Sequence, residues 1–143
     1  MVDYIRELRE LTARLPSMWH YQPEMTVRVL IVEEQKSVNR LIVDTLSYFV
    51  CDWKAAENIK DALEKIEKYD FDILLANVVL KREGEGAIVV KAFQDKSPNS
   101  VVIIMSSDED RLKDYSKFFA TLVMPFGMYD LVKRVQGGME NKR

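Results

Sequence analysis

From Val27 onward, short and almost entirely apolar runs alternate with segments whose apolar residues recur at helical spacing. The first run, Val27–Val32, has the composition of a strand that is buried on both faces of a sheet. We expect further strands at 53–56, 72–78, 101–105 and 121–123. Helices are expected at 38–49, 59–69, 87–94, 109–119 and from Pro125 through 135, with Ser37 capping the first and Gly137-Gly138 ending the last. Five such β-α repeats predict an α/β fold, a doubly wound five-stranded parallel sheet with helices on both faces.

Length and composition limit the classes of protein that this chain can be. The 143 residues suffice for one domain, and 48% hydrophobic with 31% charged residues is typical of a globular protein. The formal charge of -2 supplies no positive field for nucleic acid or an anionic membrane. A single Cys51 and a single His20 leave no internal disulfide and no His/Cys metal cluster, and no stretch resembles a signal peptide or a membrane span. These features predict a cytoplasmic protein that binds neither nucleic acid nor membrane.

The chain is expected to have three parts. Residues 1–25 form a helix and linker, 26–136 the α/β domain, and 137–143 a tail that is too short for an output domain. In the first part, apolar residues at 4-3-4 spacing draw one seam along a helix that Pro16 should end: Tyr4, Leu8, Leu11 and Leu15. This seam could pack on the domain or form a homodimer, and the sequence leaves both open.

Polar or sulfur-containing side chains follow four of the predicted strands. Glu33-Glu34 comes after the first, Asn77 ends the apolar run of the third, Ser106-Ser107 comes after the fourth and Met124 after the fifth. Ligands of open parallel sheets bind at the carboxyl ends of the strands. We therefore expect these residues to lie together at one edge of the sheet and to form the candidate site.

The same segments resemble the receiver domain of two-component response regulators, across roughly residues 27–135. The resemblance is carried by the order and spacing of four matches: Val29–Glu34, Asp72–Asn77, Ile103–Ser107 and Met124–Phe126. It implies a flavodoxin-like, CheY-like fold.

In the receiver family, two acidic residues hold Mg²⁺, an aspartate accepts the phosphoryl group, a Ser or Thr binds its oxygens and a lysine pairs with them. Glu33, Glu34 and Ser106 keep three of these features here. Asn77 replaces the aspartate, and a carboxamide cannot form an acyl phosphate. Met124 replaces the lysine with an uncharged thioether. The resemblance thus implies a degenerate site without a cofactor, where Glu33, Glu34 and the Asn77 carbonyl hold Mg²⁺ weakly at most.

The region that reports phosphorylation in the family also departs from its pattern. Thr121 stands where the family has a switch aromatic, and the segment between Ser106 and Met124 is shorter by roughly four residues, about one helical turn. Aromatic and methionine side chains gather near this region, as core residues or as a partner-binding face: Tyr115, Phe118, Phe119, Met128 and Tyr129.

Taken together, these features predict a pseudo-receiver, a signalling module that works without phosphorylation or catalysis. Its partner would be a protein, such as a histidine kinase or another signalling protein. One alternative is an α/β domain that binds a small molecule or nucleotide, although Glu33–Lys36 stands where a glycine-rich phosphate loop would follow the first strand. Another is a fragment of a larger hybrid kinase or regulator.

Overall fold

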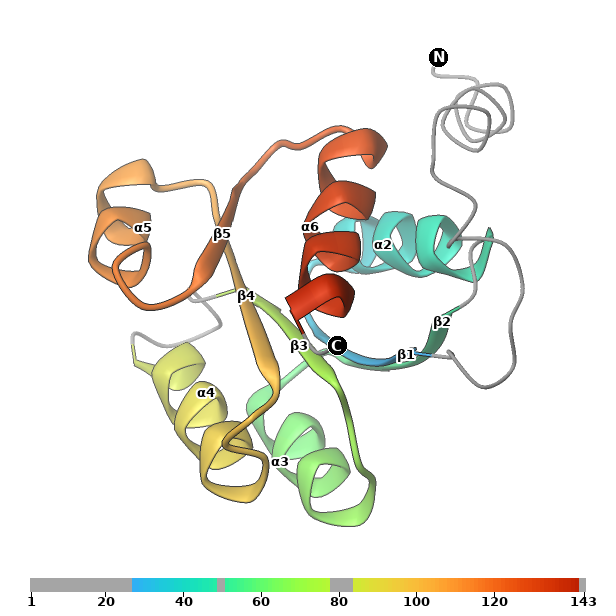
Figure 1. Ribbon diagram of the computed structural model, residues 1–143, viewed down its shortest axis with the longest axis vertical. Coiled ribbons are helices and arrows are strands. Elements are labelled where there is room, and N and C mark those ends of the chain that lie inside the picture. The colour runs from blue at the N-terminus through green and yellow to red at the C-terminus, as the bar shows by residue number, and fades with distance from the viewer. Residues whose placement is uncertain (1–26, 49–50, 78–83, 142–143) are drawn as a thin grey trace.

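The computed structural model describes residues 27–48, 51–77 and 84–141. These residues form one parallel sheet with the strand order β2-β1-β3-β4-β5 (Figure 1). The strands are β1 (Val27–Val32), β2 (Cys51–Ala56), β3 (Ile73–Asn77), β4 (Val101–Ser106) and β5 (Ala120–Val123). The helices are α2 (Lys36–Tyr48), α3 (Ile59–Lys68), α4 (Glu85–Lys96), α5 (Glu109–Tyr115) and α6 (Met128–Asn141). The predicted five-stranded, doubly wound parallel fold is confirmed, whereas the helix expected within residues 1–25 lies outside the described residues.

One face of the sheet is covered by α2 and α6 (Figure 1). Because side chains alternate along a strand, Ile31, Leu75 and Ile103 all point to this face. They are fully buried against Ile42 of α2 and Leu131 of α6. The two helices are therefore held to the sheet by an apolar layer that is continuous across the central strands.

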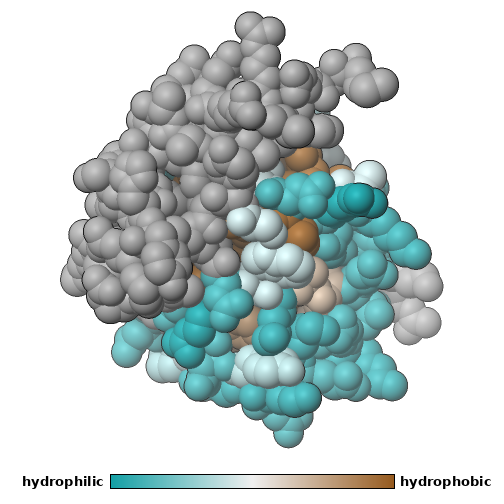
Figure 2. Space-filling view, turned by 90° about the vertical axis from the view of Figure 1, so that its right-hand side faces the viewer, coloured by the Kyte–Doolittle hydropathy of each residue, from teal (hydrophilic) through white to brown (hydrophobic). Residues whose placement is uncertain are grey.

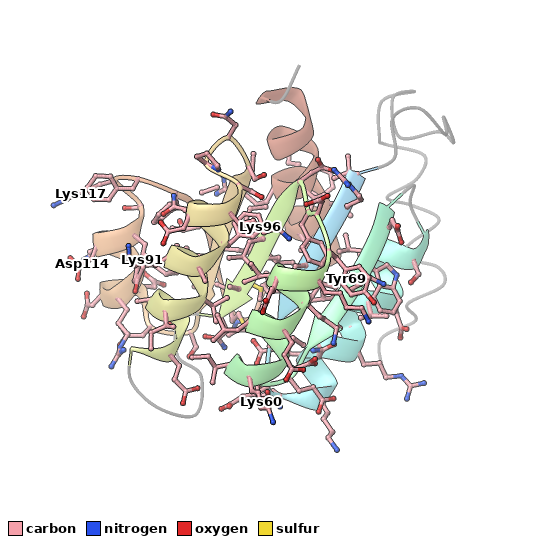
Figure 3. All side chains as sticks on the ribbon, turned by 90° about the horizontal axis from the view of Figure 1, so that it is seen from below. Lys60, Tyr69, Lys91, Lys96, Asp114 and Lys117 are labelled. Carbon is pink, nitrogen blue, oxygen red and sulfur yellow. The ribbon has the colours of Figure 1, made fainter. Side chains whose placement is uncertain are left out.

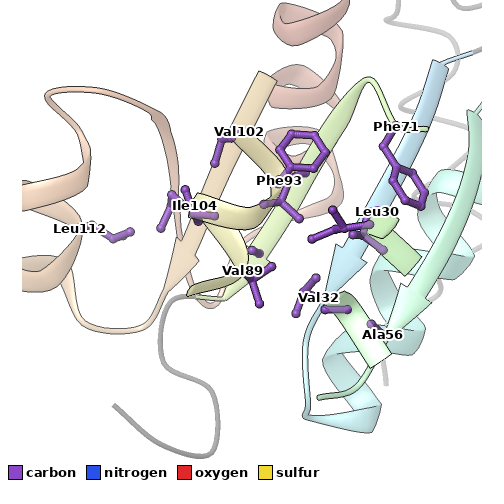
Figure 4. Packing of buried hydrophobic residues seen from close by; sticks show 14 residues of the cluster. Leu30, Val32, Ala56, Phe71, Val89, Phe93, Val102, Ile104 and Leu112 are labelled. Atoms are coloured by element: carbon purple, nitrogen blue, oxygen red, sulfur yellow. The ribbon is translucent and has the colours of Figure 1, made fainter. Parts of the chain in front are cut away.

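The opposite face is covered by α3, α4 and α5 (Figure 1), and Figure 4 shows the hydrophobic side chains that pack there. Leu30, Val32 and Ile104 supply the strand side of this layer. Phe93 of α4 fills its centre with 1% of its surface exposed, and Leu112 of α5 closes it beside β4. Burial on both faces explains why the strands read as unbroken apolar runs in the sequence.

Several predicted ends of helices are wrong. Ser37 does not cap α2, because that helix begins one residue earlier, at Lys36. Nor does Gly137-Gly138 end α6, which continues to Asn141. Glycine in a helix costs about 1 kcal/mol but does not force termination. The buried Val132 and Val135 fix the preceding turns of α6 on the sheet.

The helices α4 and α5 also differ in length from the prediction. α4 begins two residues early, at Glu85, because Gly84 precedes it with a φ of 89°, a conformation that glycine adopts without strain. α5 ends at Tyr115, four residues before the expected Phe119. The Tyr115 carbonyl accepts hydrogen bonds from the backbone amides of Phe118 and Phe119, at 3.0 and 2.9 Å, in the turn that leads to β5.

A lysine ties α4 to the end of α3. Lys96 Nζ donates hydrogen bonds to the backbone carbonyls of Glu67 (3.1 Å) and Tyr69 (2.8 Å), and also to that of Ile66. Carbonyls at a helix C-terminus lack intrahelical partners, so a cation placed there satisfies them. In Figure 3, Lys96 points inward between the two helices, whereas Lys91 of the same helix points outward.

The face on which α2 and β2 lie is mainly hydrophilic where its residues are described. Figure 2 shows this side of the molecule, where a narrow hydrophobic band runs beside hydrophilic residues. Among the described residues, no helix combines the length and the apolarity that crossing a bilayer would require.

Candidate functional site

The topology brings together the residues that follow the strands. The chain leaves β1 toward β2 on one side and returns to β3 on the other, so the strand order reverses at β1 and β3. β1 pairs with β3, β3 with β4 and β4 with β5, all in parallel. Glu33, Asn77, Ser106 and Met124 therefore lie side by side at the carboxyl edge, as expected from the sequence. This edge is where open α/β sheets bind their ligands.

A direct hydrogen bond joins Glu33 to Asn77. The Asn77 amide Nδ2 donates to Glu33 Oε2 at 2.8 Å, and both residues are buried. The other carboxylate oxygen, Oε1, accepts from the backbone N–H of Gln35 at 3.0 Å. Both oxygens of Glu33 thus accept a hydrogen bond from an uncharged donor.

The backbone around Glu33 is fixed as firmly as its side chain. Its N–H donates to the carbonyl of Ala56 at the end of β2 (3.1 Å), and its carbonyl accepts from the Asn39 side-chain amide (2.9 Å). Glu33 is accordingly fully buried, with 0% of its surface exposed. Asn39 was not singled out from the sequence, although an amide one turn into a helix at a strand end is a recognisable anchor for the preceding loop.

The environment of Glu33 raises its pKa above the ordinary value of 4.5. Burial is the largest cause, because it disfavours the charged carboxylate. The hydrogen bonds from Gln35 and Asn77 oppose this effect and lower the pKa, while the charge of Glu34 adds to it. The Asn77 amide therefore stabilises the ionised form of Glu33, which a carboxylate at the same place would destabilise.

The hydroxyl group of Ser106 is engaged in a hydrogen bond within the domain. Its hydroxyl is buried, with 1% of the residue exposed, and accepts a hydrogen bond from the Asp108 backbone N–H at 3.0 Å. Asp108 in turn caps α5 by accepting from the backbone of Asp110 (3.0 Å) and Arg111 (3.3 Å). The neighbouring Ser107 lines the pocket described next.

A pocket of about 500 Å³ lies between α2 and the connection from β5 to α6. Its polar lining includes Glu34, Asn77 and Ser107. Its apolar lining comes from Val38 and Leu41 of α2 together with Met124 and Phe126. Sequence analysis found Glu34, Asn77 and Met124 but missed the α2 residues, whose helical spacing marked them only as core.

The acidic pair Glu33 and Glu34 does not belong to a larger cluster of metal-binding side chains among the described residues. Within the described ranges, no group of three or more His, Cys, Asp or Glu side chains is placed to hold a metal ion. Glu33 and Glu34 are adjacent, but both oxygens of Glu33 are already hydrogen-bonded. The expectation of weak Mg²⁺ binding at this pair remains a prediction.

Met124 and Thr121 stand on opposite sides of the β5 end. Met124 is half-buried, packs with Phe126 against the apolar layer under α2 and α6, and its N–H donates to the Ser106 carbonyl at 2.9 Å. Thr121 pairs with Ile104 in the sheet and is also half-buried. It lines a separate groove of about 810 Å³ between β5 and α6, together with Lys133 and Arg134.

The proposed partner-face residues have divergent surroundings. Tyr115 and Phe119 are half-buried and pack against the layer under α3, α4 and α5, with their ring centroids 6.3 Å apart. Phe118 is 79% exposed and Tyr129 is 38% exposed. The side chain of Met128 lies outside the described part of the chain. Sequence analysis missed the exposed Val123 beside this face, because a β5 residue reads as core.

The chain is similar in sequence to known proteins. Residues 29–136 match the response regulator receiver domain family. The response regulator protein PilR of Pseudomonas aeruginosa is 28% identical over 80 residues, which are 56% of this chain and 18% of PilR. The chain thus spans less than a fifth of the length of that relative.

Solved structures agree in fold. The Francisella response regulator 1452 receiver domain has a TM-score of 0.70 at 21% identity, covering 82% of this chain and 99% of that one. A CheY-like receiver domain protein from Methanospirillum hungatei has a TM-score of 0.72 at 19% identity, covering 82% and 96%. TrrA of Thermotoga maritima, solved with Mg²⁺ and beryllofluoride, has a TM-score of 0.69 at 20% identity, covering 78% and 97%. Since the family model matches most of its length, the chain belongs to the response regulator receiver domain family.

Proposed function

We propose that this receiver domain is a pseudo-receiver, a non-enzymatic signalling module that acts through protein contacts and without phosphorylation. The observation that carries the proposal is the 2.8 Å hydrogen bond from the Asn77 amide to the buried Glu33 carboxylate. The amide occupies the phosphoacceptor position and uses its N–H to hold the acidic residue that would otherwise bind a metal.

Three chemical features support the loss of phosphorylation. A carboxamide is a far poorer nucleophile than a carboxylate, so position 77 cannot yield an acyl phosphate. Mg²⁺ would have to displace two hydrogen bonds from Glu33 and accept a ligand set with one anion fewer. Met124 offers no charge to a phosphoryl group. A complex with Mg²⁺ and beryllofluoride like that of TrrA is therefore not expected here.

Receiver domains interact with histidine kinases and other signalling proteins, and the finer assignment for this chain is a proposal. The exposed Phe118, Val123 and Tyr129 make the α5–β5–α6 side the preferred partner surface. A cytoplasmic location and a homodimer formed through residues 1–25 complete the proposal. The chain matches only a small part of PilR, so the activity of PilR as a whole is not carried over to this chain.

The test is ¹⁹F NMR of the protein with beryllofluoride and Mg²⁺. The wild-type chain is expected to show no bound-fluoride resonances. The double variant N77D/M124K, which returns the carboxylate and the ammonium together, is expected to gain them. A stoichiometric adduct on the wild type would refute the proposal.

A second candidate function, binding of a small molecule, is favoured by one observation. The 500 Å³ pocket at the carboxyl edge has the size of known ligand sites and a largely apolar lining.

A further inference from the structure

The pocket between α2 and the β5–α6 connection holds a carboxylate that no neighbour neutralises. Glu34 lines the pocket and is half-buried. Among residues 27–48, 51–77 and 84–141, none forms a hydrogen bond or an ion pair with its side chain. Glu33 differs, because Gln35 and Asn77 occupy both of its oxygens. Glu34 is thus the carboxylate that remains available to a ligand.

The walls of the pocket have a different character from its acidic end. Val38 and Leu41 of α2 line it together with Met124 and Phe126, and its lining among the described residues contains no lysine, arginine or histidine. An apolar wall stabilises an alkyl chain, and an aromatic ring such as that of Phe126 also attracts cations. The pocket therefore combines one negative group with an apolar body.

This combination discriminates among ligand classes. A phosphate or carboxylate ligand would meet Glu34, and no basic side chain of the described lining would offset the repulsion. A bare Mg²⁺ ion requires several oxygen ligands in octahedral geometry and gains nothing from apolar walls. An organic cation needs a single carboxylate for its charged group and an apolar surface for the remainder.

We propose that this pocket binds a small organic cation, with its ammonium group at Glu34 and its alkyl chain between Val38, Leu41, Met124 and Phe126. The inference rests on the proposed function in one respect, namely that no phosphoryl group occupies the same space. The replacement of the usual lysine by Met124 leaves Glu34 to a cation from outside, since a lysine at position 124 would have supplied an ammonium group from within the domain.

The test is a titration of the ¹⁵N-labelled full chain, followed by NMR, with three probes of equal length: pentylammonium, 1-pentanol and pentanoate. Pentylammonium is expected to shift the amide signals of Val38, Leu41 and Phe126, with a dissociation constant about fivefold lower than that of pentanol, since one partly shielded ion pair is worth about that factor. Pentanoate is expected to leave the signals unchanged.

Two variants locate the charge that binds. E34Q should weaken pentylammonium binding about fivefold and leave pentanol binding unaltered, because only the ion pair is lost. E57Q is the matched control, since Glu57 is exposed at the end of β2 and does not line the pocket. Equal affinities for pentylammonium and pentanol, an unaltered affinity in E34Q, or no shifts at millimolar pentylammonium would overturn the inference. Fluoride resonances with beryllofluoride would instead refute the proposed function, so the two failures are distinguishable.

Discussion

Replacing Asn77 by aspartate tests the role of the amide most sharply. In the wild type, Asn77 Nδ2 donates to Glu33 Oε2 at 2.8 Å inside the domain. N77D exchanges this donor for a second carboxylate of nearly the same shape. The change removes one hydrogen bond to a charged group and places two like charges in contact.

The size of the effect follows from two limits. With charge centres about 4 Å apart and an effective dielectric constant of about 20, the repulsion is about 4 kcal/mol. The lost hydrogen bond adds about 1.5–3 kcal/mol. The protein can avoid most of this cost by taking up a proton, which costs about 1.4 kcal/mol for each pH unit above the ordinary carboxyl pKa of 4.5. The protonated acid can then donate to its neighbour in place of the amide.

Protonation therefore sets the cost of N77D and makes it depend on pH. The free energy of unfolding should fall by about 3 kcal/mol at pH 7 and by less than about 1 kcal/mol at pH 5. Urea denaturation at pH 5, 6 and 7, followed by circular dichroism, measures the difference. Mg²⁺ at pH 7 should raise the free energy of unfolding of N77D but leave that of the wild type unchanged, because only the variant has three carboxylates at the site.

N77A is the control that separates the missing hydrogen bond from the added charge. It should cost less than N77D at pH 7 and change less with pH, since it removes the hydrogen bond that favours ionised Glu33 but adds no charge. If N77D cost the same at pH 5 as at pH 7, the two carboxylates would not be in contact, and the reasoning on the Glu33–Asn77 pair would be refuted.

Three further substitutions test other parts of the structure. Because the pKa of Glu33 is raised, this residue binds more protons in the native than in the unfolded state between pH 4.5 and the raised pKa, so its contribution to the free energy of unfolding falls as pH rises through that window. E33Q should lose this contribution, and its stability relative to wild type should rise from pH 4 to pH 7 in urea titrations. A constant difference would contradict the assignment. K96M should lower the free energy of unfolding by about 1–3 kcal/mol because carbonyls at the end of α3 lose their donor. K91M, whose lysine is exposed, should change it by under about 0.5 kcal/mol. Equal effects of the two variants would argue that Lys96 does not cap α3. F93A should cost about 3–5 kcal/mol in the same assay, since Phe93 fills the centre of its layer; a cost under about 1 kcal/mol would mean that the layer repacks.

The fold could be predicted because its signal is repeated and local. Each central strand is buried on both faces, so runs such as Val27–Val32 stand out from the helical segments between them. The order of the strands was not predicted, because right-handed crossovers fix the hand of each β-α-β unit but not which strands are neighbours. The ends of helices were less predictable, because the packing of Val135 outweighs the low helix propensity of Gly137-Gly138.

The candidate site could be predicted as a set of neighbours but not as a set of contacts. The positions of Glu33, Asn77 and Ser106 at the carboxyl ends of three predicted parallel strands were enough to place them at one edge of the sheet. Which atoms meet depends on rotamers and on burial, which a linear pattern does not encode. The sequence could therefore not reveal that Ser106 bonds to Asp108, or that Asn77 holds Glu33 and leaves Glu34 open to the pocket.

The central claim is that this receiver domain works without phosphorylation, and intact-protein mass spectrometry after incubation with acetyl phosphate and Mg²⁺ tests it most directly. The account predicts that the mass of the wild-type chain stays unchanged under conditions that modify the N77D/M124K variant. A stoichiometric gain of one hydroxylamine-labile phosphoryl group on the wild type would contradict it.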